Sequence, residues 1–181
     1  MYTHFVGVGS NIEPAQNIAR GLQSLLSMSQ RVHISSIRVT EPVDINGDAH
    51  FLNLALAFSS PLSPQALKVR FNQIEAALGR DRADPDRGKK SRTIDLDILF
   101  SLEALDGVDF DTLLPTEPYL RPQAQELMGY LGLTPQQKTL SLPSVAIGLD
   151  SLSIGRHPAT IERDQVGHIH LNAAPDAAPC H

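Results

Sequence analysis

The sequence of 181 residues lacks tryptophan and contains a single cysteine, Cys180. One cysteine excludes an intramolecular disulfide framework, so the composition does not point to an oxidising compartment. Long hydrophobic runs are missing too, and the apolar stretch at residues 1–9 is too short and too soon interrupted for a signal peptide. We therefore expect a cytoplasmic protein that has no membrane partner.

Basic residues are scarce, and they are unevenly distributed. The chain has 15 Lys and Arg against 20 Asp and Glu, a formal charge of -5, which argues against a nucleic-acid partner. Six of the 15 nevertheless lie between residues 80 and 92, in a segment interrupted by Pro85 and Gly88. Such a loop can neutralise a phosphate chain, because guanidinium groups bind phosphate oxygens in pairs. A solvated loop with local Asp–Arg pairs is the alternative interpretation.

The segment directly after this loop alternates between polar and apolar residues. In a strand, Ile94 and Leu96 would face one way, and Asp95 and Asp97 the other. The two carboxylates would lie about 7 Å apart, two strand rises, which suits a pair of hard cations bridged by phosphate oxygens. A half-buried strand with an acidic solvent face is the alternative. Together, the loop and the carboxylates predict a phosphoryl-transfer site that uses Mg²⁺.

Hydrophobic periodicity predicts alternating strands and helices over the first hundred residues. We expect strands at 5–8, at 32–39 with a bend at Ser35-Ser36, at 51–58 and at 94–100, and helices that begin at Pro14 and Pro64, the second ending at Gly79. This β-α-β-β-α-β order predicts an α+β fold of the ferredoxin-like class, in which the helices pack on one face of a sheet.

Beyond residue 100 the periodic signal weakens. We expect a hairpin at 102–108 and a third helix at 123–131 as C-terminal additions. The length and the absence of internal repeats favour one domain, residues 1–157, followed by a polar and weakly ordered tail, residues 158–181. The histidines of this tail do not have the spacing of a standard zinc site.

Several short motifs occur in the order typical of one enzyme family. They are Gly9-Ser10-Asn11, Thr40-Glu41-Pro42-Val43, Phe51-Leu52-Asn53, Ile74-Glu75 followed by Gly79-Arg80-Asp81-Arg82, and the specific run from Ser91 to Phe100. With them, residues 3–100 resemble the 6-hydroxymethyl-7,8-dihydropterin pyrophosphokinase (HPPK) family of the folate pathway. The resemblance implies a ferredoxin-like fold and transfer of diphosphate from ATP to the hydroxymethyl oxygen of the dihydropterin, with release of AMP. ATP and the dihydropterin would be the substrates of a monomer.

The resemblance also implies roles for individual residues. Asp95 and Asp97 would bind two Mg²⁺ ions, and with Arg82 and Arg92 they would form the catalytic group. The residues expected to bind ATP are Glu75, Arg80, Arg82, Arg87, Lys89, Lys90, Arg92 and Arg121. The residues expected to bind the pterin are Thr40, Pro42, Val43, Phe51, which would stack on the ring, and Asn53, which would hydrogen-bond to it.

The chain departs from the family pattern at three points. It has no Trp before the Asp strand, it reads Pro115-Thr116 where the family has Pro-His, and no Phe follows Arg121. A second aromatic residue for stacking on the pterin is therefore not expected. Two alternatives remain open: a catalytically weak relative that binds pterin or nucleotide, and another two-metal nucleotide enzyme, such as a cyclase-like domain, on the same fold.

Overall fold

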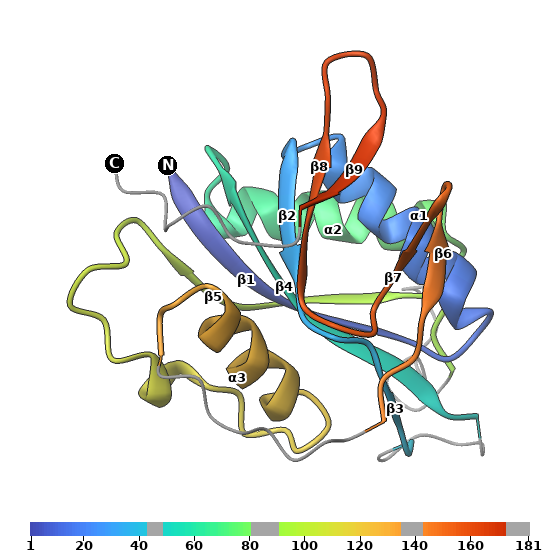
Figure 1. The fold of residues 1–181 in the computed structure, drawn as a ribbon, viewed down its shortest axis with the longest axis horizontal. Helices are drawn as coiled ribbons and strands as arrows, with labels where there is room; N and C mark the ends of the chain where they lie inside the picture. Colours follow the sequence, from blue (N-terminus) through green and yellow to red (C-terminus); the bar gives the residue numbers. More distant parts are fainter. Residues whose placement is uncertain (43–48, 81–90, 135–142, 173–181) are drawn as a thin grey trace.

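The computed structural model describes residues 1–42, 49–80, 91–134 and 143–172 (Figure 1). Its elements are β1 (Tyr2–Ser10), α1 (Pro14–Leu26), β2 (Arg31–Ile34), β3 (Arg38–Thr40), β4 (Phe51–Ser60), α2 (Pro64–Ala77), β5 (Asp95–Leu102), the 3₁₀ helix η1 (Phe110–Leu113), α3 (Arg121–Tyr130), β6 (Ile147–Leu149), β7 (Leu152–Ile154), β8 (Ala159–Arg163) and β9 (Ile169–Asn172). None of the helices in this described part is long and apolar enough to cross a membrane.

One antiparallel sheet organises the described residues. Its strands follow the order β5-β1-β4-β2-β8-β9, and β3 pairs with β4 beside β2. Strands β1, β4, β2 and β8 each have a strand on either side, while β5 is an edge strand. The strand predicted at 51–58 is therefore central, as its apolar faces indicated.

The strand predicted at 32–39 is interrupted where a bend was expected. Between β2 and β3 the hydroxyl of Ser35 accepts a hydrogen bond from the amide of Ala55 at 3.0 Å, while the amide of Ser35 donates to the carbonyl of Ala55 at 2.9 Å. A side chain thus replaces one backbone partner, and β2 and β3 lie along the same edge of β4. Counted as one interrupted strand, they complete the predicted order of elements up to β5.

Helices α1 and α2 pack on one face of this sheet. Both begin at a proline as predicted, and the hydroxyl of Ser63 caps α2 by accepting the Ala66 amide at 3.3 Å. Helix α2 ends at Ala77, and two residues later Gly79 has a φ of 89°, which suits a residue without a side chain. The shared core under these helices contains Val6, Val8, Ile18, Leu22, Leu54, Leu56, Leu67 and Phe71.

Helix α3 packs on the opposite face, in front of the sheet in Figure 1. A second apolar cluster joins Leu120, Ala124 and Leu127 of this segment to Phe5 and Ala57 of the sheet. The third helix was predicted as a C-terminal addition without a face, whereas the two helices of the β-α-β-β-α-β unit pack on one face as predicted. Helix α3 leaves part of this second face uncovered, and the candidate site lies there.

Two expectations for the C-terminal half were wrong. The hairpin expected at 102–108 does not form, because β5 ends at Leu102 and the chain turns into η1, whose first amides are capped by Asp109. The weakly ordered tail expected from residue 158 contains β8 and β9, and β8 extends the sheet beside β2 with Ile161 fully buried. Strands this short have little periodicity of their own and depend on the edge that β2 offers. Residues 173–181 lie outside the described part.

Candidate active site

Two rows of residues cross the sheet on the face that α3 leaves uncovered. In the first row Asp95 of β5 pairs with Gly9 of β1, which pairs with Asn53 of β4. In the second row, two residues further along each strand, Asp97 pairs with Gly7. The two carboxylates therefore face the same side, as predicted. Because each carboxylate has a glycine as its neighbour on β1, the floor between β5 and β4 carries no side chains.

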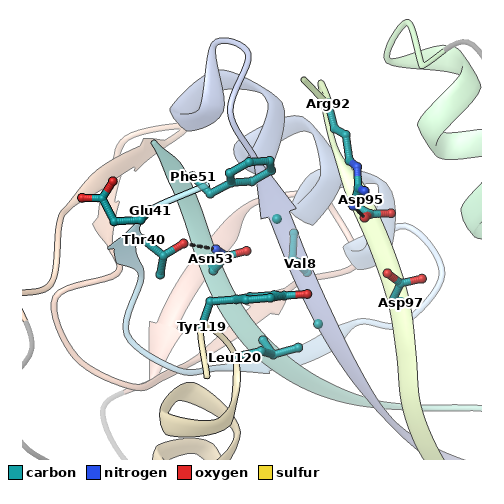
Figure 2. Close-up of a pocket in the computed structure, with 12 residues that line it drawn as sticks. Val8, Thr40, Glu41, Phe51, Asn53, Arg92, Asp95, Asp97, Tyr119 and Leu120 are labelled. Atoms are coloured by element: carbon teal, nitrogen blue, oxygen red, sulfur yellow. Dashed lines mark hydrogen bonds and ion pairs between the residues drawn. The ribbon is translucent and has the colours of Figure 1, made fainter. Parts of the chain in front are cut away.

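A pocket lies over this floor. Its lining residues are Gly7, Val8, Gly9, Thr40, Glu41, Phe51, Asn53, Arg92, Asp95, Asp97, Tyr119 and Leu120, and its space is about 600 Å³ when the open mouth is counted. Figure 2 shows the rings of Phe51 and Tyr119 on either side of an open space, with Asn53 on one flank and the two aspartates on the other. An aromatic slot thus adjoins an anionic strand.

Asn53 is held in one orientation at the end of the first row. Its Nδ2 donates to the Thr40 hydroxyl at 2.6 Å, and its Oδ1 lies over Gly9, where a Cβ atom would come within 2.6 Å of it. A glycine at position 9 is therefore required for this side chain to lie flat across the floor. An amide oxygen beside two aromatic rings can accept hydrogen bonds from the edge of a flat, nitrogen-rich ligand.

Asp95 is buried between two arginines. Its Oδ1 accepts a hydrogen bond from Arg80 and its Oδ2 one from Arg92, and its side chain is 12% exposed. Burial lowers the pKa of Arg80, but the hydrogen bond and charge of Asp95, with the charges of Glu75 and Asp97, outweigh it and raise this pKa above its ordinary value. Both arginines therefore present fixed positive charge beside the carboxylate.

The Gly-Ser-Asn motif positions the segment that carries Arg92. The carbonyl of Arg92 accepts the amides of Asn11 and Ile12, and its amide donates to Oδ1 of Asn11 at 2.7 Å. Ser10 donates its hydroxyl to the carbonyl of Thr93 at 2.6 Å. The turn after β1 therefore fixes Arg92 at the mouth of the pocket, a function that the motif alone did not reveal.

Asp97 lies in a different environment from Asp95. Its side chain is 62% exposed, and its Oδ1 accepts a hydrogen bond from Nζ of Lys68 at 2.9 Å. No group of three or more His, Cys, Asp or Glu placed to hold a metal occurs among the described residues. Two carboxylates on one strand face are nevertheless a donor set that fits Mg²⁺, which takes one or two protein carboxylates and completes its shell with phosphate and water.

Three residues predicted to bind ATP do not line the pocket: Glu75, Arg80 and Arg121. Glu75 is fully buried, and its Oε1 accepts the amide of Leu96 at 2.8 Å and forms an ion pair with Nη1 of Arg80 at 3.1 Å. The side chain of Arg121 donates to the carbonyl of Pro115 at 3.2 Å, and it does not line the pocket. In this structure Glu75 supports Arg80 and the edge of β5, and it does not face a ligand.

The remaining predicted residues divide into three groups. Thr40, Phe51 and Asn53 line the pocket with the two aspartates and Arg92. Pro42 is half-buried but does not line it. Val43, Arg82, Arg87, Lys89 and Lys90 lie outside the described residues.

Tyr119 is an aromatic pocket residue that sequence reasoning missed, as it also missed Glu41 and Leu120. It precedes α3, and the packing of Leu120 over Gly7 brings it across the sheet from Phe51. Burial raises the pKa of Tyr119 and the charge of Glu117 adds to the effect, so the phenol stays neutral in the physiological range. The only signal in the sequence was an aromatic residue shortly after Pro115, at a position where none was expected.

Comparisons with known proteins agree with this geometry. The model of the family described as 7,8-dihydro-6-hydroxymethylpterin-pyrophosphokinase (HPPK) matches residues 5–143. A stretch of 98 residues, 52% of this chain, is 37% identical to the 2-amino-4-hydroxy-6-hydroxymethyldihydropteridine pyrophosphokinase of Bacillus subtilis (strain 168), and it spans 57% of that protein's length. The family match covers most of the chain and every residue that lines the pocket. The chain therefore belongs to the HPPK family.

Proposed function

We propose that this protein transfers the terminal diphosphate of ATP to the hydroxymethyl oxygen of 6-hydroxymethyl-7,8-dihydropterin and releases AMP. One observation carries the proposal: the two rows place an anionic, arginine-flanked strand and an aromatic slot in the same pocket, separated by a glycine floor. A flat acceptor and a triphosphate can therefore lie side by side on one surface. Membership of the family supports the same reaction over that of a cyclase-like enzyme.

The slot explains how the acceptor would be oriented. The ring of the pterin fits between Phe51 and Tyr119, where stacking favours a flat aromatic ligand. Asn53, fixed by Thr40, would accept hydrogen bonds from the edge of the ring. With the ring held on this side of the floor, the hydroxymethyl group can point along the two rows toward β5. This orientation would supply much of the catalysis, because the loss of translational and rotational entropy is met on binding and not in the reaction step.

The β5 side of the pocket, where Arg92 lies beside Asp95 and Asp97, would hold the nucleotide. Arg92 lines the pocket and is fixed through its backbone, so its guanidinium can exchange Asp95 for phosphate oxygens without a large movement. Two Mg²⁺ ions held by Asp95 and Asp97 would neutralise the phosphate chain and the charge that develops as the diphosphate moves. Arg80 is tied to both Glu75 and Asp95, so it would keep the carboxylate in place.

Three further assignments accompany this proposal. The strands β5-β1-β4-β2, with α1 and α2 on one face, support a ferredoxin-like fold for this part of the chain. A monomer is the oligomeric state that this proposal includes. ATP and a folate precursor are intracellular metabolites, which supports a cytoplasmic location.

The test is product analysis by mass spectrometry after incubation with ATP, Mg²⁺ and 6-hydroxymethyl-7,8-dihydropterin. We expect AMP and the pterin diphosphate in equal amounts. Asp97→Asn should lower the rate at least about 100-fold, or about 2.7 kcal/mol, whereas Asp111→Asn, an exposed aspartate on η1, should have no effect. Binding of both substrates by calorimetry without AMP formation would indicate instead a relative that only binds them.

A further inference from the structure

The ammonium group of Lys68 lies at the carboxylate side of the pocket, where the proposed reaction gives it no role. Lys68 belongs to α2, on the other face of the sheet, and its side chain reaches around the edge strand β5. Its Nζ donates to Oδ1 of Asp97 at 2.9 Å and to the carbonyl of Leu96 at 3.1 Å. Two acceptors on adjacent residues thus fix a side chain that is 40% exposed.

Stability of the fold does not explain the contact with Asp97. An ion pair between side chains that are 40% and 62% exposed contributes little to folding, because water solvates both charges almost as well. The contact does change the availability of Asp97. One of its two oxygens accepts a hydrogen bond from a cation that belongs to the chain itself, so a metal ion would have to compete with a permanently nearby ammonium group.

We propose that Lys68 is a positioning residue that holds Asp97 while no metal is bound and competes with Mg²⁺ for its carboxylate. Lys68 therefore sets the metal concentration at which the site is loaded. The inference rests on the proposed function, because that function is what requires a metal at Asp97. It concerns Asp97 and not Asp95, since Asp95 is 12% exposed and held by two arginines, while Asp97 is the carboxylate that solvent ions reach directly.

The size of the effect follows from two contributions. An exposed ion pair is worth a factor of up to about five in an equilibrium constant, which is the competition for the oxygen atom itself. An ammonium that stays a few ångströms away still repels a divalent ion through high-dielectric surroundings, which contributes a comparable factor. Removing the charge of Lys68 should therefore tighten metal binding by about three- to tenfold.

The experiment is a titration with Mn²⁺ in the absence of nucleotide, with free Mn²⁺ measured by electron paramagnetic resonance. Lys68→Met keeps most of the length of the side chain and removes its charge, so its Mn²⁺ affinity should rise three- to tenfold. Lys68→Arg retains the charge and should bind Mn²⁺ within about twofold of the parent protein. The difference between Lys68→Met and the parent should shrink in high salt, because the charges involved are exposed.

Two controls locate the effect. Arg70→Met removes an exposed charge from the same helix, where Arg70 contacts Gln73, and it should leave Mn²⁺ binding unchanged. Asp97→Asn should weaken Mn²⁺ binding strongly, which shows that the measured ion lies at Asp97. Thermal melting of each variant checks that it is folded.

The outcomes separate this inference from the function on which it rests. An unchanged or weaker Mn²⁺ affinity in Lys68→Met would overturn the competition, and product formation by the parent protein would then leave the proposed function intact. A parent protein that binds no Mn²⁺ and forms no product would overturn both. Equal gains in Lys68→Met and Arg70→Met would also overturn it, because the effect would then depend on net charge alone.

Discussion

A single methyl group at Gly9 tests the geometry of the pocket. The Cβ atom of Gly9→Ala would lie 2.6 Å from Oδ1 of Asn53, about 0.8 Å inside the ordinary contact range that begins at 3.4 Å. Asn53 must therefore move, and its 2.6 Å hydrogen bond to Thr40 stretches or breaks. If the ligand loses two hydrogen bonds at about 0.5–1.5 kcal/mol each, its affinity falls at least about fivefold and up to about 150-fold.

The measurement is the affinity for 6-hydroxymethylpterin in the presence of a non-hydrolysable ATP analogue, by calorimetry. The affinity for the analogue alone should change less than twofold, because Asp95 and Arg92 lie on the other side of the floor. Gly148→Ala is the matched control: a Cβ atom added to this strand glycine would meet no atom of the described residues within 4 Å, so the variant should bind both ligands like the parent. Unchanged pterin affinity in Gly9→Ala would refute the assignment of Asn53 to the ligand.

Three further predictions follow from other contacts. Tyr119→Leu should raise KM for the pterin about tenfold with little change in KM for ATP. An unchanged ratio of the two KM values would show that Tyr119 does not contact the pterin. Glu75→Gln should destabilise the fold by about 2–4 kcal/mol in urea unfolding, because a buried charge partner of Arg80 is lost; a change below about 1 kcal/mol would contradict this. Burial lowers the pKa of His33 from 6.5 to about 4, so the folded protein disfavours the charged imidazole. The free energy of unfolding should therefore be highest above pH 6.5, and the contribution of His33 should lower it by up to about 3 kcal/mol as the pH drops toward 4. His33→Gln should lack that part of the pH dependence, and identical pH profiles would show that other groups cause it.

Local patterns in the sequence were sufficient for the elements up to β5. Proline at the first turn marks the start of α1 and α2 in both sequence and structure, because it needs no hydrogen-bond partner there. The alternation around Asp95 and Asp97 placed both carboxylates on one face, since the period of a strand is two. Signals of this kind depend only on neighbours within a few residues, so they can be recognised in a single sequence.

The pocket itself depends on contacts between distant segments. Gly9 faces Asn53 and Asp95 only through the registers of two strand pairs, and nothing near Gly9 in the sequence encodes either register. The same applies to Tyr119, which reaches the slot because α3 docks on the second face of the sheet. Gly7 and Gly9 likewise leave the floor free of side chains only because of the strands that pair with β1 on either side.

The charges around the two aspartates show most clearly what the sequence could not reveal. Two carboxylates on one strand face are expected to repel each other when no metal is bound. In the structure each has a cation: Asp95 has Arg80 and Arg92, and Asp97 has Lys68. All three cations come from outside β5: Arg92 lies three residues before Asp95 in the chain, whereas Arg80 and Lys68 come from more distant segments and reach an edge strand. The metal-free site is thus already compensated, so loading it with metal and triphosphate requires an exchange of partners. Neutralising Asp97 would then leave Lys68 without its carboxylate and would relieve no repulsion, which explains why metal affinity, and not melting temperature, is the informative measurement at this strand.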